Sequence, residues 1–333
     1  KLADADEAAI EAAMAAPPPG PTGAGVGTVR EWAGAAERYI DDLAGRFPLD
    51  LSGLRIAVDC ANGAAVATAP AVLARLGARV DAIGVAPDGV NINVECGSTH
   101  LDALAARVRE GGHDLGLAFD GDADRVLAVD ASGRPVDGDQ ILAVCALWLR
   151  DRDELPGGAV VTTTMTNLGF RRAMAAAGVG VHWTDVGDRY VLAEMRAAGL
   201  VLGGEPSGHL INLRSGPTGD GLASALLLLQ ALLGRGVTLA DAAAVVQHLP
   251  QRLVSVRVAR KQELAGADEV WDLVREFERE MGEDGRIVVR ASGTEPLVRV
   301  MVEAPSADEC ERWCARVAGA AERVLGAAAP AAT

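Results

Sequence analysis

The stretch LRIAVDCANGAAVATAPAVLARLGARVDAIGV, residues 54–85, determines the fold that we expect. It begins with the apolar run LRIAVD, which is typical of a buried strand. A loop of small residues follows, then a helical segment at 67–77 and a second apolar run at 78–85. A strand, a helix and a second strand in close succession predict a βαβ unit with parallel strands.

The same alternation of strands and helices continues outward to about residue 249. Beyond that point the pattern changes to a strand, a helix, two strands around a short loop, and a closing helix. We therefore predict an α/β fold class, with two consecutive α/β sheet domains and a smaller α+β C-terminal domain. The predicted segments are 51–150, 151–249 and 250–326, preceded by a helix, a Pro/Gly linker (17–27) and a connecting helix (28–47) in residues 1–50, and followed by a tail at 327–333.

Composition and charge indicate which kinds of partner, such as nucleic acids, anionic substrates or membranes, the chain could bind. The formal net charge is −15, which argues against a nucleic-acid-binding surface and leaves an anionic substrate dependent on local arginines or a metal. The apolar run at 221–234 is too short to span a bilayer, so we expect no membrane association. The five cysteines are sparse, with Cys310 and Cys314 one helical turn apart, which predicts reduced thiols, packing in a core and a cytoplasmic setting.

The loop AFDGDADRV, residues 118–126, carries three carboxylates, Asp120, Asp122 and Asp124, between two apolar strands. A calcium EF-hand is excluded, because its sixth and twelfth positions would be Arg125 and an alanine. A phosphatase-type loop with a nucleophilic first aspartate remains open as a minor alternative. Three carboxylates without His or Cys favour a Mg²⁺ site, with the arginine balancing charge or contacting a phosphate.

Two further loops offer binding chemistry. GGEPSGH, residues 203–209, places a carboxylate, a hydroxyl and an imidazole on one short loop, which suits recognition of a polyol, although an ordinary glycine-rich turn explains it equally well. RASGTEP, residues 290–296, offers hydroxyls and successive backbone N–H groups, an anion-binding arrangement. Arg290 and Arg299 add positive charge around it, and arginine binds phosphate in a bidentate manner.

The motifs DGDADR, GGEPSGH and RASGTEPLVRVMVEA, in this order, resemble those of the α-D-phosphohexomutases. VDCANGAA, NINVECGSTH, TDVGDRYVLAEM and TGDG narrow the resemblance to the phosphoglucosamine mutases, over nearly the whole chain. The resemblance implies four domains around a cleft and interconversion of glucosamine 6-phosphate and glucosamine 1-phosphate. That reaction proceeds through a bisphosphate and a phosphoserine, with glucosamine or glucose 1,6-bisphosphate as activator.

The resemblance also implies a role for particular residues. Mg²⁺ would be held by the three aspartates, with Arg125 beside it, while Glu205 and Ser207 would hold sugar hydroxyls. His209 and Asp188 are the candidate acid and base. The phosphate that does not react would be bound by Arg290, Ser292, Gly293, Thr294 and Arg299.

Two departures from the family pattern qualify these expectations. The nucleophilic serine of the family lies in a Ser-His-Asn-Pro loop, which does not occur in these residues. We therefore expect residues 1–50 to include a remnant of the first domain, and the chain by itself to be inactive. Pro206 stands where phosphoglucosamine mutases usually carry glutamine, so a phosphoglucomutase or phosphomannomutase activity remains open, as does a non-catalytic sugar-phosphate-binding fragment. Among assemblies, a homodimer also remains open.

Overall fold

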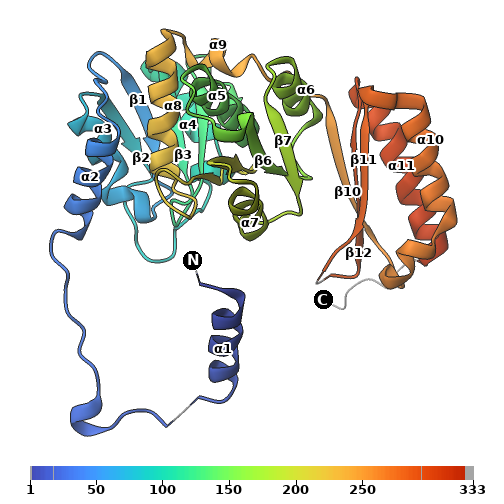
Figure 1. The fold of residues 1–333 in the computed structure, drawn as a ribbon, viewed down its shortest axis with the longest axis horizontal. Helices are drawn as coiled ribbons and strands as arrows, with labels where there is room; N and C mark the ends of the chain where they lie inside the picture. The colour runs from blue at the N-terminus through green and yellow to red at the C-terminus, as the bar shows by residue number, and fades with distance from the viewer. Residues whose placement is uncertain (1, 18, 294, 327–333) are drawn as a thin grey trace. The chain divides into compact units, whose positions relative to one another are not determined.

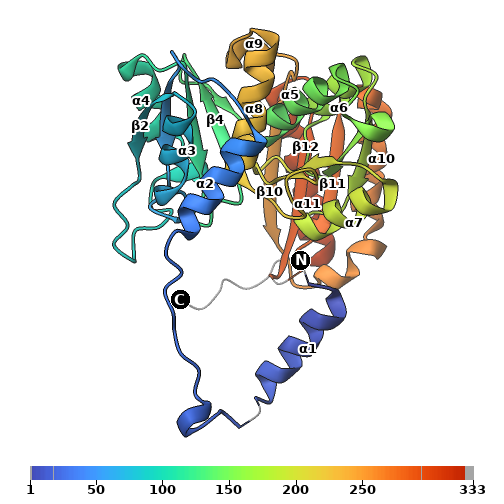
Figure 2. The same cartoon turned by 60° about the vertical axis from the view of Figure 1, so that its left-hand side comes forward.

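The computed structural model (Figures 1 and 2) describes residues 2–17, 19–293 and 295–326. The chain divides into two compact units. The first unit consists of Lys1–Thr164 with Val179–Ala243, and the second consists of Met165–Gly178 with Ala244–Thr333.

The first unit begins with two helices joined by a long connection, α1 (Asp4–Ala15) and α2 (Ala35–Arg46), with a short 3₁₀ turn at Gly23–Gly25 between them. The prediction that one helix spans 28–47 was wrong at its start. Gly34 adopts a left-handed conformation (φ 79°) immediately before α2, so Trp32 lies outside the helix and is 70% exposed. The buried face of α2 is formed by Ile40 and Leu43.

A five-stranded sheet in the order β2-β1-β3-β4-β5 confirms the predicted βαβ unit. β1 pairs in parallel with both β2 and β3, while β4 and β5 run antiparallel to their neighbours. Every residue of β3 is buried, which places the acidic loop at the end of a core strand. The elements are β1 (Arg55–Asp59), α3 (Ala69–Arg75), β2 (Arg79–Ile83), α4 (Asp102–Gly111), β3 (Leu115–Phe119), β4 (Val126–Asp130), β5 (Pro135–Val136) and α5 (Gly138–Asp151).

A second sheet of the same unit has the order β7-β6-β8-β9, with β9 antiparallel to β8. The strand β9 was not predicted, because three residues are too few to show an alternation of apolar and polar side chains. Most residues of α8 are buried, as predicted, and among the described residues no helix could cross a membrane. The elements are β6 (Ala159–Thr163), β7 (Gly180–Thr184), α7 (Asp188–Ala198), β8 (Leu202–Gly204), β9 (Leu210–Asn212), α8 (Gly221–Arg235) and α9 (Leu239–Ala243).

The second unit contains an antiparallel sheet in the order β10-β12-β11, with helices α10 and α11 packed on one face (Figure 1). Trp313 is fully buried beneath α10 and meets Phe277 edge-on, with ring centroids 5.3 Å apart. Cys310 and Cys314 are buried in this core, as predicted, and Ser306 caps α11. The elements are α6 (Leu168–Ala176), β10 (Gln251–Arg257), α10 (Asp268–Met281), β11 (Arg286–Ala291), β12 (Leu297–Glu303) and α11 (Ala307–Leu325).

The helix α6 belongs to the second unit although its neighbours in sequence belong to the first. The N–H of Leu168 donates to Glu303 Oε2 at 3.0 Å, and Asn167 exchanges two hydrogen bonds with the backbone of Leu249. The bond to Glu303 satisfies one of the free N–H groups at the buried start of α6, and the two bonds to Leu249 hold its capping residue Asn167 in place. The observed sheets and helices confirm the predicted fold class, while the boundaries at 150 and 249 remain predictions.

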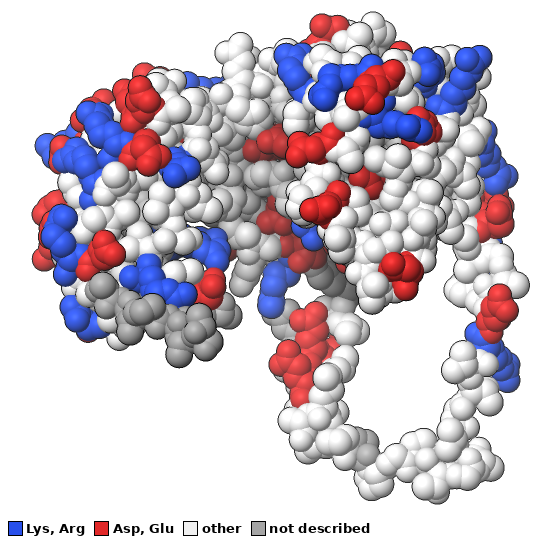
Figure 3. Space-filling model, turned by 180° about the vertical axis from the view of Figure 1, so that it is seen from behind, with Lys and Arg blue, Asp and Glu red and all other residues white. Residues whose placement is uncertain are grey.

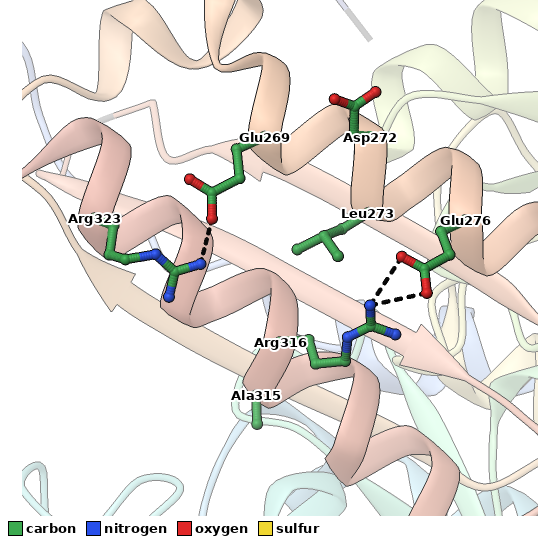
Figure 4. Close-up of a pocket in the computed structure, with 7 residues that line it drawn as sticks. All are labelled: Glu269, Asp272, Leu273, Glu276, Ala315, Arg316 and Arg323. Carbon is green, nitrogen blue, oxygen red and sulfur yellow. Dashed lines mark hydrogen bonds and ion pairs between the residues drawn. The ribbon is translucent and has the colours of Figure 1, made fainter.

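Charged side chains are intermingled on the molecular face shown in Figure 3. The same mixture lines a hollow of about 580 Å³ between α10 and α11 (Figure 4). There Arg316 forms an ion pair with Glu276 at 2.8 Å, and Arg323 forms one with Glu269. Because the arginines in this hollow are engaged by neighbouring carboxylates, it is a weak candidate for a binding site.

Candidate functional site

The acidic loop connects β3 to β4 and curls tightly. Ala123 has a left-handed conformation (φ 61°), and its N–H donates to the carbonyl of Asp120 at 3.1 Å. This curl brings carboxylate oxygens of Asp120, Asp122 and Asp124 within 4.8 Å of one another. The first of these aspartates is only 2% exposed, whereas Asp122 is exposed to solvent.

Arg125 neutralises part of this charge. Its Nε lies 2.7 Å from Asp120 Oδ2 and 3.5 Å from Asp124 Oδ1. Both of these oxygens are nevertheless buried without a well-oriented hydrogen bond. A buried oxygen without a hydrogen bond lowers the stability of the folded chain unless another partner binds it. Carboxylate oxygens are the ligands that hard divalent cations prefer. The residues present therefore fit a cation such as Mg²⁺.

The sugar loop predicted at 203–209 forms the turn between β8 and β9. The N–H of Glu205 donates to the carbonyl of His209 at 3.1 Å, and Glu205 Oε1 accepts the N–H of Gly187 at 3.1 Å. Ser207 is exposed at the tip of the turn. The carbonyl of Pro206 accepts the first N–H of α5 at 3.0 Å, a backbone contact that does not depend on the proline side chain. The sugar loop is therefore anchored on both sides.

His209 joins the sugar loop to the acidic loop. Its Nδ1 lies 3.1 Å from Asp124 Oδ2, and its Nε2 lies 3.9 Å from the carboxylate of Asp188, the first residue of α7. The His209 side chain is only 9% exposed. The carbonyl of Gly208 also accepts the N–H of Val126 at 3.1 Å. The structure thus brings one predicted acid/base residue, His209, against the acidic loop, and places the other, Asp188, next to the imidazole of His209.

A third turn, TGDG at 218–221, supports this assembly, and its role was missed in the sequence. The N–H of Gly221 donates to the carbonyl of Ala123 at 3.0 Å. Asp220 caps α8 and accepts the hydroxyl of Tyr39 on α2 at 2.8 Å. Burial, with the Asp220 carboxylate as the second cause, raises the pKa of Tyr39, so the phenol remains a donor. The motif itself was the available signal, since a glycine following a capping aspartate permits close backbone approach.

The predicted phosphate loop lies between β11 and β12 in the second unit. Arg290 and Arg299 are directly opposite each other in the register of these strands, which brings two positive charges to its base. Ser292 is 8% exposed, and its hydroxyl oxygen accepts the N–H of Glu295 at 3.3 Å. Gly293 is exposed beside it, and Thr294 lies outside the described residues.

Lys261 contacts the same loop and was also missed. Its ammonium donates to the carbonyls of Ser292, Gly293 and Glu295 at 2.7, 3.1 and 2.8 Å. A signal existed in the sequence, because only two of the 31 basic residues are lysines. A lysine retained in an arginine-rich chain marks a place where an ammonium and a guanidinium are not equivalent.

The comparisons with known proteins agree with these motifs. Three models of the phosphoglucomutase/phosphomannomutase family match the chain: alpha/beta/alpha domain II at residues 37–133, alpha/beta/alpha domain III at 137–249, and the C-terminal domain at 253–320. The phosphoglucosamine mutase of Saccharopolyspora erythraea is 53% identical over 298 residues, which cover 90% of this chain and 67% of that protein. The phosphoglucosamine mutase of Streptomyces coelicolor is 49% identical over 331 residues, which cover 98% of this chain and 73% of that protein.

Solved structures share the fold at lower identity. One is the Aspergillus fumigatus N-acetylphosphoglucosamine mutase in complex with GlcNAc-6P and magnesium, with a TM-score of 0.70, 23% identity, and coverage of 90% of this chain and 68% of that one. A phosphoglucomutase/phosphomannomutase family protein from Burkholderia thailandensis has a TM-score of 0.75 at 21% identity, and the match covers 100% of this chain and 72% of that one. The identities of about 50% to curated relatives, together with the three family models and the acidic, sugar and phosphate loops, show that this chain belongs to the phosphoglucosamine mutases, isomerases of the phosphohexomutase superfamily.

Proposed function

We propose that this chain supplies the metal-, sugar- and phosphate-binding parts of an enzyme that interconverts glucosamine 6-phosphate and glucosamine 1-phosphate through a bisphosphate intermediate. The observation that carries this proposal is the buried acidic loop. Two of its carboxylate oxygens lack well-oriented hydrogen bonds, and Arg125 and His209 lie against it. Such a loop is suited to phosphoryl transfer, which depends mostly on positioning and charge neutralisation.

We propose Mg²⁺ as the cation, held by Asp120, Asp122 and Asp124. When bound, it would neutralise charge on a phosphoryl group during transfer. Arg125 would add a second positive charge at the same place, because its guanidinium already lies between two of the aspartates.

The sugar would be oriented by the sugar loop. Glu205 uses Oε1 for the N–H of Gly187, so its other carboxylate oxygen would accept a sugar hydroxyl. Ser207, exposed at the tip, would supply a hydroxyl. His209 and Asp188 would exchange the proton of the attacking or leaving sugar oxygen, in accordance with their position beside the acidic loop.

The phosphate that does not react would be bound by the loop in the second unit. Arg290 and Arg299 would supply charge, and Ser292, Gly293 and Thr294 would supply hydroxyl and N–H donors. The activator would be glucosamine or glucose 1,6-bisphosphate. The substrate class has one alternative, a glucose or mannose phosphate, because Pro206 offers no side-chain amide to an amino sugar.

The test is calorimetric titration of glucosamine 6-phosphate into the wild-type chain and into Arg290→Ala. Loss of one charge-assisted contact should cost about 1.5–3 kcal/mol, a weakening of roughly 10- to 100-fold. Arg279→Ala is the matched control, because that arginine is exposed on α10 and removes the same charge. Equal dissociation constants for the wild type and Arg290→Ala would show that the loop is an ordinary hairpin. Parallel titrations with glucose 6-phosphate and mannose 6-phosphate separate the alternative substrates.

A further inference from the structure

The ammonium of Lys261 is held by three carbonyls of one loop. The lysine is the first residue of the 3₁₀ helix Lys261–Gly266, which follows β10. The three acceptors belong to Ser292, Gly293 and Glu295 and lie 2.7, 3.1 and 2.8 Å from Nζ. An ammonium has three hydrogen-bond donors, so all three are used within the loop.

This arrangement fixes the direction in which the loop presents its donors. In a trans peptide the N–H points away from the preceding carbonyl, and no cis peptide bond occurs among the described residues. Because the carbonyl of Ser292 points toward Lys261, the N–H of Gly293 points away from it. The hydroxyl oxygen of Ser292 accepts the N–H of Glu295, which leaves its own hydrogen available to a ligand.

We propose that Lys261 is a positioning residue for the phosphate loop. By drawing the carbonyl of Ser292 to one side, it turns the N–H of Gly293 to the other side, where a phosphate would be bound. It also adds a third positive charge behind Arg290 and Arg299, which face each other across β11 and β12. This inference rests on the proposed phosphate-binding function of the loop. It adds that a residue outside the loop, Lys261, fixes the conformation of the loop.

The identity of the residue supports a geometric role. The chain uses arginine for nearly all of its basic positions, and Lys261 is one of only two lysines. A planar guanidinium donates in a fixed fork and does not match three carbonyls that converge on one point. An arginine would supply the same positive charge. The choice of lysine is therefore explained by the three carbonyls that converge on a single nitrogen atom.

The experiment compares three variants, Lys261→Met, Lys261→Arg and Lys261→Cys, the last before and after alkylation with bromoethylamine. Alkylation restores an ammonium at nearly the lysine length. We expect affinity for glucosamine 6-phosphate to fall at least tenfold in all three variants and to recover largely after alkylation of the cysteine. Binding of Mg²⁺, which depends on the other unit, should be unchanged in each variant.

Several results would overturn the inference. Wild-type affinity in Lys261→Met would show that the loop needs no support from this residue. Wild-type affinity in Lys261→Arg would show that charge suffices, and failure of alkylation to restore affinity would show that the ammonium is not the active feature. The wild type treated with the same reagent controls for Cys96, which is only partly buried.

The inference and the proposed function fail in distinguishable ways. If the wild type does not bind glucosamine 6-phosphate, the proposed function fails. If the wild type binds it and Arg290→Ala weakens binding while the Lys261 variants do not, only the inference fails. Should Lys261→Met not fold, as judged by its urea unfolding transition, Lys261→Arg retains the charge and still decides the question.

Discussion

At the scale of single residues, two aspartates of the acidic loop differ in burial, and we expect one to matter for stability and the other for cation binding. Asp120 is buried and bonded to the backbone of Arg125, so its replacement would affect the loop itself. Asp122 is exposed and belongs to the same group of converging carboxylates. A change at Asp122 therefore tests the cation without disturbing the core.

We predict that Asp122→Asn lowers the affinity for Mg²⁺ by at least about tenfold, since even outer-shell changes at metal sites cost about 10- to 100-fold. The physical reason is the loss of one charged oxygen ligand from a set of three. Calorimetric titration of both forms measures it. Asp153→Asn is the control, because Asp153 is exposed, lies in the same unit and has a left-handed conformation (φ 56°) that asparagine adopts readily. Equal affinities, or a preference for zinc, would rule out a magnesium site at this loop.

A buried carboxylate gives the second unit a pH dependence. Glu303 is fully buried, where it accepts the N–H of Leu168 and pairs with Arg286 at 3.0 Å. Burial raises its pKa above the usual 4.5, and the nearby guanidinium opposes this only in part. Since the folded pKa lies above the unfolded one, the folded unit binds more protons between the two values, and stability is lost as pH rises through that range.

We predict that the free energy of unfolding of the second unit decreases as pH rises from about 4.5, and that Glu303→Gln reduces this slope. Urea titrations at a series of pH values measure it, with unfolding followed by tryptophan fluorescence, to which Trp271 and the buried Trp313 of the second unit contribute. Glu278→Gln is the control, because that glutamate is exposed on α10 and should leave the slope unchanged. Identical slopes for the wild type and Glu303→Gln would show that another group is responsible.

At the scale of the elements, the start of α8 supports the acidic loop through a glycine, Gly221. A Cβ at Gly221 would lie 2.6 Å from the carbonyl oxygen of Arg125 and 2.9 Å from that of Ala123. Both oxygens are backbone atoms, so neither can move without displacing the acidic loop. The helix N-terminus and the loop are thus packed at a distance that only glycine permits.

We predict that Gly221→Ala destabilises the first unit by about 1–3 kcal/mol and weakens Mg²⁺ binding, because overpacking forces backbone shifts. Urea unfolding and calorimetry measure the two effects. Gly45→Ala in α2 is the matched control, since a Cβ there meets nothing within 4 Å. That change should be neutral or stabilising by up to about 1 kcal/mol. Wild-type Mg²⁺ affinity in Gly221→Ala would mean that the loop is held by other contacts.

The elements also show what the sequence could and could not predict. Long apolar runs such as 54–59 and 115–119 indicated their strands because burial on both faces leaves a continuous signal. The short strand β9 left no such signal. Trp32 suggested a longer helix, but Gly34 ends the preceding segment in a left-handed conformation. The acidic cluster was predictable because its three aspartates lie within five residues, whereas the contact of Lys261 with Ser292 joins residues 31 apart in sequence and depends on tertiary structure.

At the scale of the whole molecule, the chain has groups suited to each proposed binding role, but it lacks the serine motif that the family's reaction uses. In the proposed function, the acidic loop, the sugar loop and the phosphate loop would supply a cation site, hydroxyl contacts and anion contacts. The mechanism implied by the family resemblance also stores a phosphoryl group on a serine in a Ser-His-Asn-Pro loop. That stretch does not occur in the 333 residues.

We predict that the 333-residue chain, assayed by itself, binds Mg²⁺ and glucosamine 6-phosphate but does not convert the latter to glucosamine 1-phosphate, even with glucose 1,6-bisphosphate present. The reason is chemical, because a bisphosphate cannot return its phosphoryl group to an acceptor that is absent. A separately prepared segment carrying the phosphoserine should restore some turnover if it binds the chain. Turnover by the chain alone that is abolished by Asp122→Asn would show that a different nucleophile acts beside the acidic loop. In that case Asp120, the first aspartate after β3, would be the residue to replace next, since a nucleophilic aspartate at that position is the alternative chemistry that such a loop supports.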